Sequence, residues 1–380
     1  MKILFLTYHG FEAASGISKK MLAQIKGLRQ NGHEVHVCSY GYAKDKHLCR
    51  FVDDQVIKDY GKGALAGIRQ RMSYGCIADY CISKGIEFVY SRNYQNASPW
   101  LINLFSRLKK AGIHSVQEIP TYPYDEEFKG YPWDKKIGLF IDQLFRNRMS
   151  KQMDAIVTFS DAKRIFGQRT INISNGVDLD VIPLHQPVEQ PQDEVHIIAV
   201  AEVHTWHGFD RFIHGLGEYY QQKPQRKVYF HIVGAVWDPE MYGSSRAPGF
   251  KTYIDQYGIK DYVIFHGSMY GDELNDVFNQ CCFAVGSLAR HRSGITHIKT
   301  LKNREYASRG IPFIYSECDS DFDHQSYIMK APADESPINI NKVLAFIDSH
   351  HFVPSEIRKT VEHLSWKMQM EKVVSQALSQ

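Results

Sequence analysis

The segment from Gly286 to Ile314 combines residue types that suit the binding of phosphate and ribose. A strand-like run leads into a basic turn, which contains Arg290, His291, Arg292 and Gly294. Backbone N–H groups near a glycine and at a helix N-terminus attract phosphate. In the helix that follows, Lys302 and Glu305 share one face, which offers a cation to phosphate oxygens and a carboxylate to ribose hydroxyls. We therefore predict a sugar-nucleotide site; an ordinary amphipathic helix that faces water is the alternative.

Length and composition predict a globular protein of two domains. The chain has 380 residues, more than one hydrophobic core usually serves, and its 43% hydrophobic and 23% charged residues are typical of globular proteins. A net charge of +3 gives no reason to expect nucleic acid as a partner. Residues 1–190 carry 26 Lys and Arg against 19 Asp and Glu, which favours an anionic partner for this half.

The cysteines and the first residues favour a cytoplasmic protein. The seven cysteines are odd in number and include no CxxC pair, so they predict neither a disulfide framework nor a zinc site and fit a reducing compartment. The opening MKILFLTYHGFE becomes polar too soon for a secretory leader or a membrane span, and we expect it to form a buried first strand.

Short strand-like runs alternate with helical segments along the whole chain, which is typical of parallel α/β sheets. The expected strands are Lys2–Thr7, Glu34–Cys38, Glu87–Ser91, His114–Glu118, Asp154–Phe159 and Thr170–Ser174, then Val195–Ala201, Lys227–Val233, Tyr262–Phe265, Cys282–Gly286 and Pro312–Tyr315. Residues 188–194 (VEQPQDE) lack apolar periodicity and are predicted to form a linker. The pattern therefore predicts two doubly wound domains, residues 1–187 and 195–353.

The run LKNREYASRGIPFI (residues 301–314) resembles the end of the donor site in retaining GT-B glycosyltransferases of family 4. Glu305 falls on the second glutamate of their E-x7-E motif, which holds the nucleotide ribose. At the first glutamate of that motif this chain has His297. This departure bears on how the hydroxyl groups of the donor sugar are held, because a neutral imidazole offers one donor and one acceptor where a carboxylate offers acceptors only.

The resemblance extends over nearly the whole chain. Ser15-Gly16-Ile17-Ser18 resembles the small-residue loop in which the backbone at Gly16 approaches the donor diphosphate. NGHEVHV, DAIVTFSDAKRIFG and ISNGVD resemble later elements of the family's first domain. The final SWKMQMEKVVSQAL resembles a helix that crosses back onto that domain, and residues 354–380 are assigned to it. Backbone groups around Gly267, Ser268 and Met269 are expected to recognise the base.

The second domain departs from the family pattern where cations are expected. WHGFDRFIHGL (residues 206–216) follows its first strand, where the family usually has an arginine and then lysine-glycine for the diphosphate. This chain has Glu202 at the arginine position and His207 at the lysine position. The cations that could replace them are Arg290, Arg292, Lys299 and Lys302. The alternative for His207 and Arg211 is an ordinary helix start.

The loop VQEIPTYPYDEE (residues 116–127) is a candidate acceptor site. The family often has a histidine here that faces the acceptor and the donor sugar, whereas this chain has Gln117 and Glu118. We expect Glu118 to hydrogen-bond an acceptor hydroxyl, with Tyr122 and Tyr124 stacked on a sugar face. The alternative for Glu118 is a structural carboxylate that caps a loop.

Two further signals have simpler explanations. Asp319-Ser320-Asp321 matches the metal-binding D-x-D of the other glycosyltransferase fold, but it follows the wrong strand, and we expect no metal there. The helical segment Trp133–Met153 has an apolar side, formed by Ile137, Phe140, Ile141, Leu144 and Phe145. Core packing is the expected reason for this side, and binding to a membrane interface is the alternative because basic residues largely surround it.

The resemblance implies a GT-B fold, with two Rossmann-like domains facing a central cleft. It implies a retaining, metal-independent glycosyltransferase that moves a hexose from a UDP- or GDP-sugar to a saccharide acceptor in bacterial surface polysaccharide synthesis. The implied catalytic residues are Glu118, Lys302 and Arg290. The implied donor-binding residues are Gly16, His207, Arg292, Gly294, His297, Ser268, Met269 and Glu305.

Partners and competing functions follow from the same resemblance. We expect no cofactor besides the donor, and a saccharide or lipid-linked saccharide as acceptor. Peripheral contact with the inner face of the membrane is a further expectation. The alternatives are a GT-B epimerase or phosphorylase and a non-catalytic sugar-nucleotide-binding protein. A dinucleotide-dependent oxidoreductase is disfavoured, because no G-x-G-x-x-G follows an expected strand.

Overall fold

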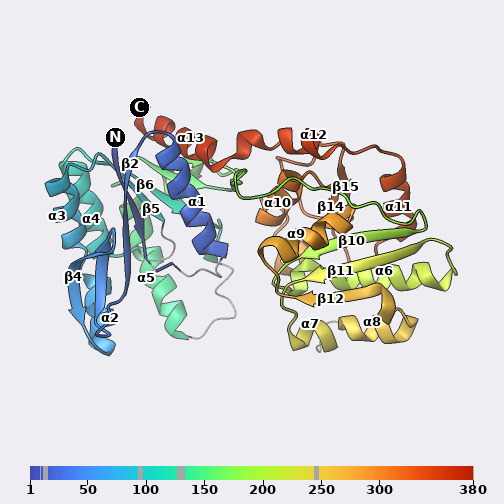
Figure 1. Cartoon of the computed structure of the whole chain (residues 1–380). Helices are drawn as coiled ribbons and strands as arrows, with labels where there is room; N and C mark the ends of the chain where they lie inside the picture. The colour runs from blue at the N-terminus through green and yellow to red at the C-terminus, as the bar shows by residue number, and fades with distance from the viewer. Residues whose placement is uncertain (9, 12–15, 93–96, 126–132, 244–247, 380) are drawn as a thin grey trace. The chain divides into compact units, whose positions relative to one another are not determined.

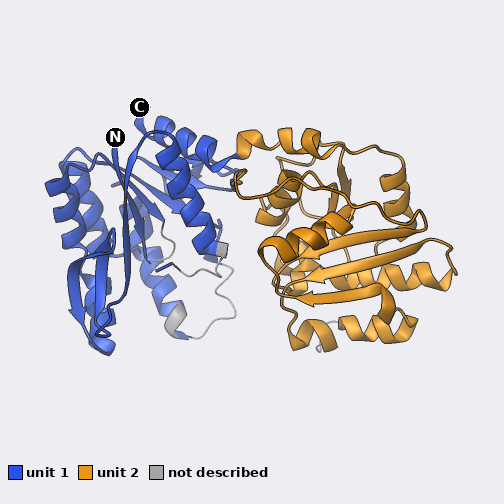
Figure 2. Cartoon of the chain, in the orientation of Figure 1, with its two compact units in different colours: residues 1–176, 365–380 blue, residues 177–364 orange. Residues whose placement is uncertain are grey.

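The chain forms two compact units (Figure 2). The first contains residues 1–176 and 365–380, and the second contains residues 177–364. The structure is a computed structural model, and it describes residues 1–8, 10–11, 16–92, 97–125, 133–243 and 248–379. Ser15, Glu126 and Glu127 of the predicted loops lie outside the described residues. In the described part of the chain, no helix is long and apolar enough to cross a membrane.

The first unit is built on a sheet of nine strands in its described part (Figure 1). Its elements are β1 (Lys2–Thr7), α1 (Gly16–Gln30), β2 (Glu34–Tyr42), β3 (Leu48–Val52), β4 (Gln55–Gly61), α2 (Ala64–Met72), α3 (Gly75–Lys84), β5 (Phe88–Arg92), α4 (Pro99–Lys110), β6 (His114–Ile119), α5 (Trp133–Ser150), β7 (Ala155–Thr158), β8 (Arg164–Ile165), β9 (Gln168–Asn172) and α13 (Trp366–Leu378). The strand order is β4-β3-β2-β1-β5-β6-β7-β9-β8. β1 pairs in parallel with β2 and β5, while β2, β3 and β4 form an antiparallel edge.

Helices cover both faces of this sheet, as a parallel sheet requires. Successive residues of a strand point to opposite faces. Ile3 and Phe5 of β1 therefore pack in the cluster that includes α1 and α13, and Leu4 and Leu6 pack in the cluster that includes α3 and α4. α1 and α13 approach closely at Gly27, where a Cβ atom would lie 2.6 Å from the backbone oxygen of Trp366.

The second unit is built on a parallel sheet of six strands in its described part. Its elements are β10 (Glu194–Val200), η2 (Thr205–His207), α6 (Phe209–Gln221), β11 (Lys227–Val233), α7 (Asp238–Tyr242), α8 (Phe250–Tyr257), η3 (Lys260–Tyr262), β12 (Val263–Gly267), α9 (Gly271–Gln280), β13 (Phe283–Val285), η4 (Arg290–Ser293), α10 (Leu301–Arg309), β14 (Phe313–Tyr315), β15 (Ile328–Lys330), α11 (Ile340–Asp348), α12 (Pro354–Lys359) and η5 (Glu362–Leu364). The strand order is β12-β11-β10-β13-β14-β15.

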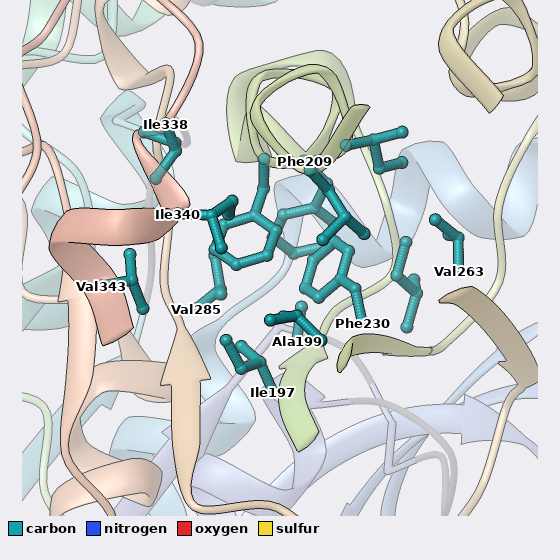
Figure 3. Close-up of a cluster of buried hydrophobic side chains, with 14 of the residues drawn as sticks. Ile197, Ala199, Phe209, Phe230, Val263, Val285, Ile338, Ile340 and Val343 are labelled. Carbon is teal, nitrogen blue, oxygen red and sulfur yellow. The ribbon is translucent and has the colours of Figure 1, made fainter. Parts of the chain in front are cut away.

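Apolar side chains fill both faces of the second sheet. Figure 3 shows the cluster in which Ile197 and Ala199 of β10 lie beneath the rings of Phe209 and Phe230. These two rings meet edge to face with their centroids 6.1 Å apart. Ile198, between the two β10 residues in sequence, belongs to the cluster on the opposite face with residues of α9, α10 and α12. β10 is therefore buried on both sides, and its carboxyl end is firmly placed.

The boundaries of the two units differ from the predicted ones. The N–H of Val177 donates to the backbone oxygen of Leu364 at 3.0 Å, and the N–H of Val188 donates to that of Asn279 at 2.8 Å. Residues 177–187 therefore belong to the second unit. The C-terminal return to the first unit begins at Ser365, after α12 and η5 have packed in the second.

Candidate functional site

The order of the strands in the second unit reverses between β10 and β13. The chain runs outward from β10 through β11 to β12, then returns to β13 and runs outward through β14 to β15. Parallel α/β sheets bind ligands at such a reversal, outside the carboxyl ends of the strands. The segments that follow these ends are η2 after β10, η4 after β13 and residues 316–318 after β14. His207 and Arg290 lie on the first two segments, and Lys302 follows in the first turn of α10.

The segments that follow β10 and β13 touch at Gly208. This glycine has a φ of 64°, and a Cβ atom here would lie 2.8 Å from the Cβ of Ala289. The N–H of Leu288 donates to the backbone oxygen of His207 at 2.8 Å. Only a residue without a side chain allows this approach and this φ together, so Gly208 lets His207 lie beside the residues that precede Arg290.

We expect Gly208→Ala to lower the free energy of unfolding by about 1–3 kcal/mol, because alanine is strained at this φ and the added methyl group has no room. The matched control is Gly258→Ala, since Gly258 also has a φ of 64° but nothing lies within 4 Å of an added Cβ. Chemical denaturation of both variants measures the difference. Equal losses would show that the contact with Ala289 tolerates a methyl group.

Two partly buried cations at the sheet reversal each have a buried nitrogen atom without a hydrogen-bond partner among the described residues. Nζ of Lys302 and Nε of Arg290 have no hydrogen-bond partner among the described residues. Burial, followed by the charge of Arg290, lowers the pKa of Lys302. The nearest aromatic groups are the ring of Phe209, 5.6 Å from Lys302 Nζ, and that of Trp206, 5.8 Å from the guanidinium of Arg290. A bound anion would supply the hydrogen bonds and the opposite charge that these two groups lack.

His207 is a neutral neighbour of the two cations. Burial, followed by the charges of Lys302 and Arg290, lowers the pKa of His207 far below its usual range. Its Nδ1 accepts a hydrogen bond from the N–H of His204 at 2.9 Å. The proton of the neutral ring is therefore on Nε2. His207 cannot replace the family's lysine as a cation, but it can donate one hydrogen bond.

Glu317 is a residue of this site that the sequence analysis misses. It follows β14, is only 2% exposed, and neither of its carboxylate oxygens has a hydrogen-bond partner in the described part of the chain. Burial raises the pKa of Glu317 above its usual range, and the charges of Arg290 and Lys302 oppose this effect. The one signal in the sequence is its place directly after a buried strand.

Two predicted donor-binding residues are engaged by other side chains of the second unit. The guanidinium of Arg292 donates to both carboxylate oxygens of Asp210, at 3.0 and 2.7 Å, and also binds the carboxylate of Glu335. These contacts tie η4 to the start of α6 and do not favour a contact of Arg292 with phosphate. Oε1 of Glu305 accepts from the guanidinium of Arg309 at 3.1 and 2.9 Å.

The other predicted donor-binding residues are placed as follows. Gly294 has a φ of 69° and ends η4, and Gly16 begins α1 in the first unit. The exposed His297 forms a β-bridge with Cys318. Ser268 is exposed and Met269 is partly buried directly after β12. Contacts of these residues with a donor stay predictions.

The D-x-D triplet has an arginine as its partner. Arg304 is fully buried, and its guanidinium donates to both oxygens of Asp319, at 2.5 and 3.0 Å, and to Asp321. The described residues contain no group of three or more His, Cys, Asp or Glu side chains that could hold a metal ion. The charges of both aspartates are thus balanced within the second unit.

Glu118, the predicted acceptor residue, lies fully buried on β6 of the first unit. Its carboxylate forms an ion pair with Lys20 at 3.3 Å and accepts hydrogen bonds from Arg92 Nε at 3.2 Å, from Gln24 Nε2 at 2.5 Å and from the hydroxyl of Tyr90. Burial alone would raise the pKa of Glu118, but the two cations and the two hydrogen bonds lower it to about 2. These contacts favour the structural alternative, and a contact with an acceptor stays a prediction.

Tyr124 is not available to stack on a sugar. It is 3% exposed, its hydroxyl donates to Asp142 at 2.7 Å, and its ring meets that of Phe166 edge to face. The expectation for Tyr124 is therefore wrong, because this side chain is part of a small core cluster.

Solved structures of other proteins share the arrangement of both units. Sucrose-phosphate synthase from Thermosynechococcus elongatus is similar with a TM-score of 0.61 and 14% identity, over 99% of this chain and 98% of its own. The E. coli trehalose-6-phosphate structure bound with UDP-2-fluoro glucose is similar with a TM-score of 0.59 and 12% identity, over 100% of this chain and 99% of its own. A Listeria monocytogenes protein assigned as a UDP-N-acetylglucosamine 2-epimerase is similar with a TM-score of 0.51 and 9% identity, over 98% of this chain and 95% of its own. No protein-family model and no curated sequence matches the chain. These structural likenesses, together with the two α/β units, show that the chain has the GT-B fold.

Proposed function

We propose that the protein is a retaining glycosyltransferase that transfers a hexose from a UDP- or GDP-sugar to a saccharide acceptor. The observation that supports the proposal is that Nζ of Lys302 and Nε of Arg290 are buried at the sheet reversal of the second unit without a hydrogen-bond partner among the described residues. The diphosphate of a sugar nucleotide would supply the missing anion. The similar structure with UDP-2-fluoro glucose bound supports a donor of this class.

The proposed chemistry needs charge stabilisation more than covalent catalysis. As the bond between the sugar carbon and the diphosphate oxygen breaks, its electron pair passes to the diphosphate, and Lys302 and Arg290 would stabilise the growing charge. In a retaining reaction the acceptor hydroxyl attacks from the face that the diphosphate leaves, and the departing phosphate takes its proton. The protein then contributes placement of the two substrates and electrostatic stabilisation, without a metal ion.

Nucleotide release from a panel of UDP- and GDP-sugars, with and without saccharide acceptors, tests this proposal. We expect acceptor-dependent release of the nucleoside diphosphate and an unchanged rate in EDTA. Activity that EDTA removes and magnesium or manganese restores would overturn the metal-free mechanism. One of the similar structures is assigned as an epimerase. An epimerase would instead change the sugar of an intact sugar nucleotide or release nucleotide without any acceptor.

We expect Glu305→Gln to weaken binding of the sugar nucleotide by about 1–3 kcal/mol, as the loss of a charged hydrogen-bond acceptor does. The physical reason is the proposed contact of its carboxylate with ribose hydroxyls. Calorimetry on the folded variant measures the affinity. The matched control is Glu273→Gln, an exposed glutamate in the first turn of α9. If both variants bind the donor as the unchanged protein does, Glu305 is not part of the site.

The apolar side of α5 is not core. Ile137, Phe140, Ile141 and Leu144 are 40–61% exposed, so core packing is the wrong explanation for these four, and Phe145 is partly buried. Among the side chains of this helix whose exposure the structure describes, Lys136 and Arg148 are exposed cations. At the same lower end of the first unit in Figure 1, α2 exposes Leu65, Ile68 and Met72. We propose that this surface contacts an anionic membrane, where a lipid-linked acceptor would be within reach.

We expect the protein to float with anionic vesicles and to do so less at high salt, since each basic residue near such a surface contributes about 1 kcal/mol. Replacing both Phe140 and Leu144 by Ser should weaken the association, because these side chains would enter the interface. Trp237→Ser in the second unit, where the tryptophan is also exposed, is the control. Equal recovery with neutral and anionic vesicles would show that the protein does not recognise anionic membranes.

A further inference from the structure

Glu317 is a buried carboxylate whose two oxygens are left without hydrogen bonds. A buried charged or polar group in that condition costs several kcal/mol unless something else completes its bonding. Lys302 and Arg290 are near enough to affect its protonation. Among the described residues, however, neither carboxylate oxygen of Glu317 has a hydrogen-bond partner. Arg290 follows β13 and Glu317 follows β14, and these two strands are neighbours, so both residues lie beyond the same edge of the sheet.

The backbone around Glu317 is held from both sides. The N–H of Cys318 donates to the backbone oxygen of Thr296 at 2.7 Å, and the N–H of Ile298 donates to that of Cys318 at 3.1 Å. On the other side, Nζ of Lys330 donates to the backbone oxygen of Glu317. Its unbonded oxygens are therefore not explained by a loosely held chain.

Lys302, Arg290 and Glu317 together favour a ligand that carries both negative charge and hydrogen-bond donors. Lys302 and Arg290 need an anion, whereas the carboxylate of Glu317 repels anions and needs hydrogen-bond donors such as hydroxyl groups. A hexose joined to a diphosphate carries hydroxyl groups and negative charge a few bonds apart. A free nucleoside diphosphate would satisfy the cations and leave the carboxylate unbonded.

We propose that Glu317 accepts hydrogen bonds from hydroxyl groups of the donor's hexose and so helps to select the sugar. The β-bridge between His297 and Cys318 places position 297 next to the residue that follows Glu317. Position 297 is where the resembled family has a glutamate, and here it is an exposed histidine. This inference rests on the proposed transferase function and specifies which residue reads the sugar.

Calorimetry with Glu317→Gln tests the proposal, with the sugar nucleotide that the unchanged protein binds best and with its nucleoside diphosphate alone. We expect the affinity for the sugar nucleotide to fall about tenfold to a hundredfold, since a hydrogen bond to a charged acceptor is lost. The affinity for the nucleoside diphosphate should stay the same or rise, because a negative charge near the diphosphate is removed. Glu273→Gln, at an exposed glutamate in the first turn of α9, is the control and should change neither affinity.

Deoxy analogues of the donor sugar provide a second measurement. In the unchanged protein, removal of the hydroxyl that Glu317 binds should weaken binding, while in Glu317→Gln the same removal should matter much less. Glu317→Asp, which keeps the charge but shortens the side chain, serves the same comparison if the glutamine variant does not fold. If the unchanged protein binds no sugar nucleotide, the proposed function fails. If it binds one and Glu317→Gln weakens sugar nucleotide and nucleoside diphosphate equally, Glu317 does not read the sugar and the function still stands.

Discussion

Replacing Lys302 by Met is expected to lower kcat/KM about 10²–10³-fold, the usual loss when one group that stabilises the transition-state charge is removed. The ammonium group lies at the sheet reversal with no partner among the described residues, so the proposed diphosphate is the anion it would stabilise. Stability should change far less than activity, because methionine removes an ammonium group that has no hydrogen-bond partner among the described residues. Nucleotide release and thermal unfolding of the same preparation measure the two effects.

Lys251→Met is the matched control for this prediction. Lys251 is an exposed lysine of the second unit, and it pairs with Asp255 one helical turn away at 2.9 Å. Its loss should leave kcat/KM unchanged. If Lys302→Met loses stability and activity together, the ammonium group supports the fold, and another group must stabilise the leaving charge.

Replacing Glu118 by Gln is expected to destabilise the first unit by about 3–5 kcal/mol, the cost of removing one partner from a buried ion pair. The change would remove the carboxylate that pairs with Lys20 and Arg92, both of which are buried. Urea denaturation at neutral pH, followed by fluorescence, measures the loss. The Lys20→Met, Glu118→Gln double variant should recover part of it, because an uncompensated charge is then removed. Equal stability of Glu118→Gln and the unchanged protein would show that the carboxylate is not needed for the fold.

The pH dependence of this stabilisation has a definite sign. Glu118 has a pKa of about 2 when folded, below the value of about 4.3 for an unfolded glutamate, so its folded form binds the proton less readily. The stabilisation by Glu118 is fully present when the pH is above the pKa of the unfolded state, and it is lost as the pH falls toward the pKa of the folded state. The difference in stability between the unchanged protein and Glu118→Gln should therefore shrink in acid.

The central strands of both units are predictable from the sequence, and one edge of the first sheet is not. β1 and β11 have the predicted bounds because each is an apolar run that helices bury. The hairpin of β3 and β4 is not predicted, since charged residues interrupt the alternation of its strands. Its turn uses Asp53 and Asp54 at φ values of 47° and 65°, where sequence patterns favour glycine and asparagine.

The candidate site shows a similar division. The positions of Lys302 and Arg290 follow from the strand–turn–helix pattern, which the sequence reveals. The neutral state of His207 depends on burial and neighbouring charges, and the engagement of Arg292 depends on Glu335, which lies far from it in sequence. Glu317 belongs to no motif and is found only when the carboxyl ends of β13 and β14 are seen together. Long-range contacts of this kind decide which charged groups of a motif remain available to a ligand.

The return of the chain to the first unit at Ser365 has a consequence for biosynthesis. Trp366, Met370 and Val373 of α13 complete a hydrophobic core that also includes residues of β1 and α1. During translation these first elements leave the ribosome long before α13 exists, whereas the second unit is a continuous segment that is finished earlier. Domains generally fold as their chain emerges. The second unit can therefore fold first. Until α13 is synthesised, part of the apolar surface of the first unit stays exposed, and this unit needs protection from aggregation.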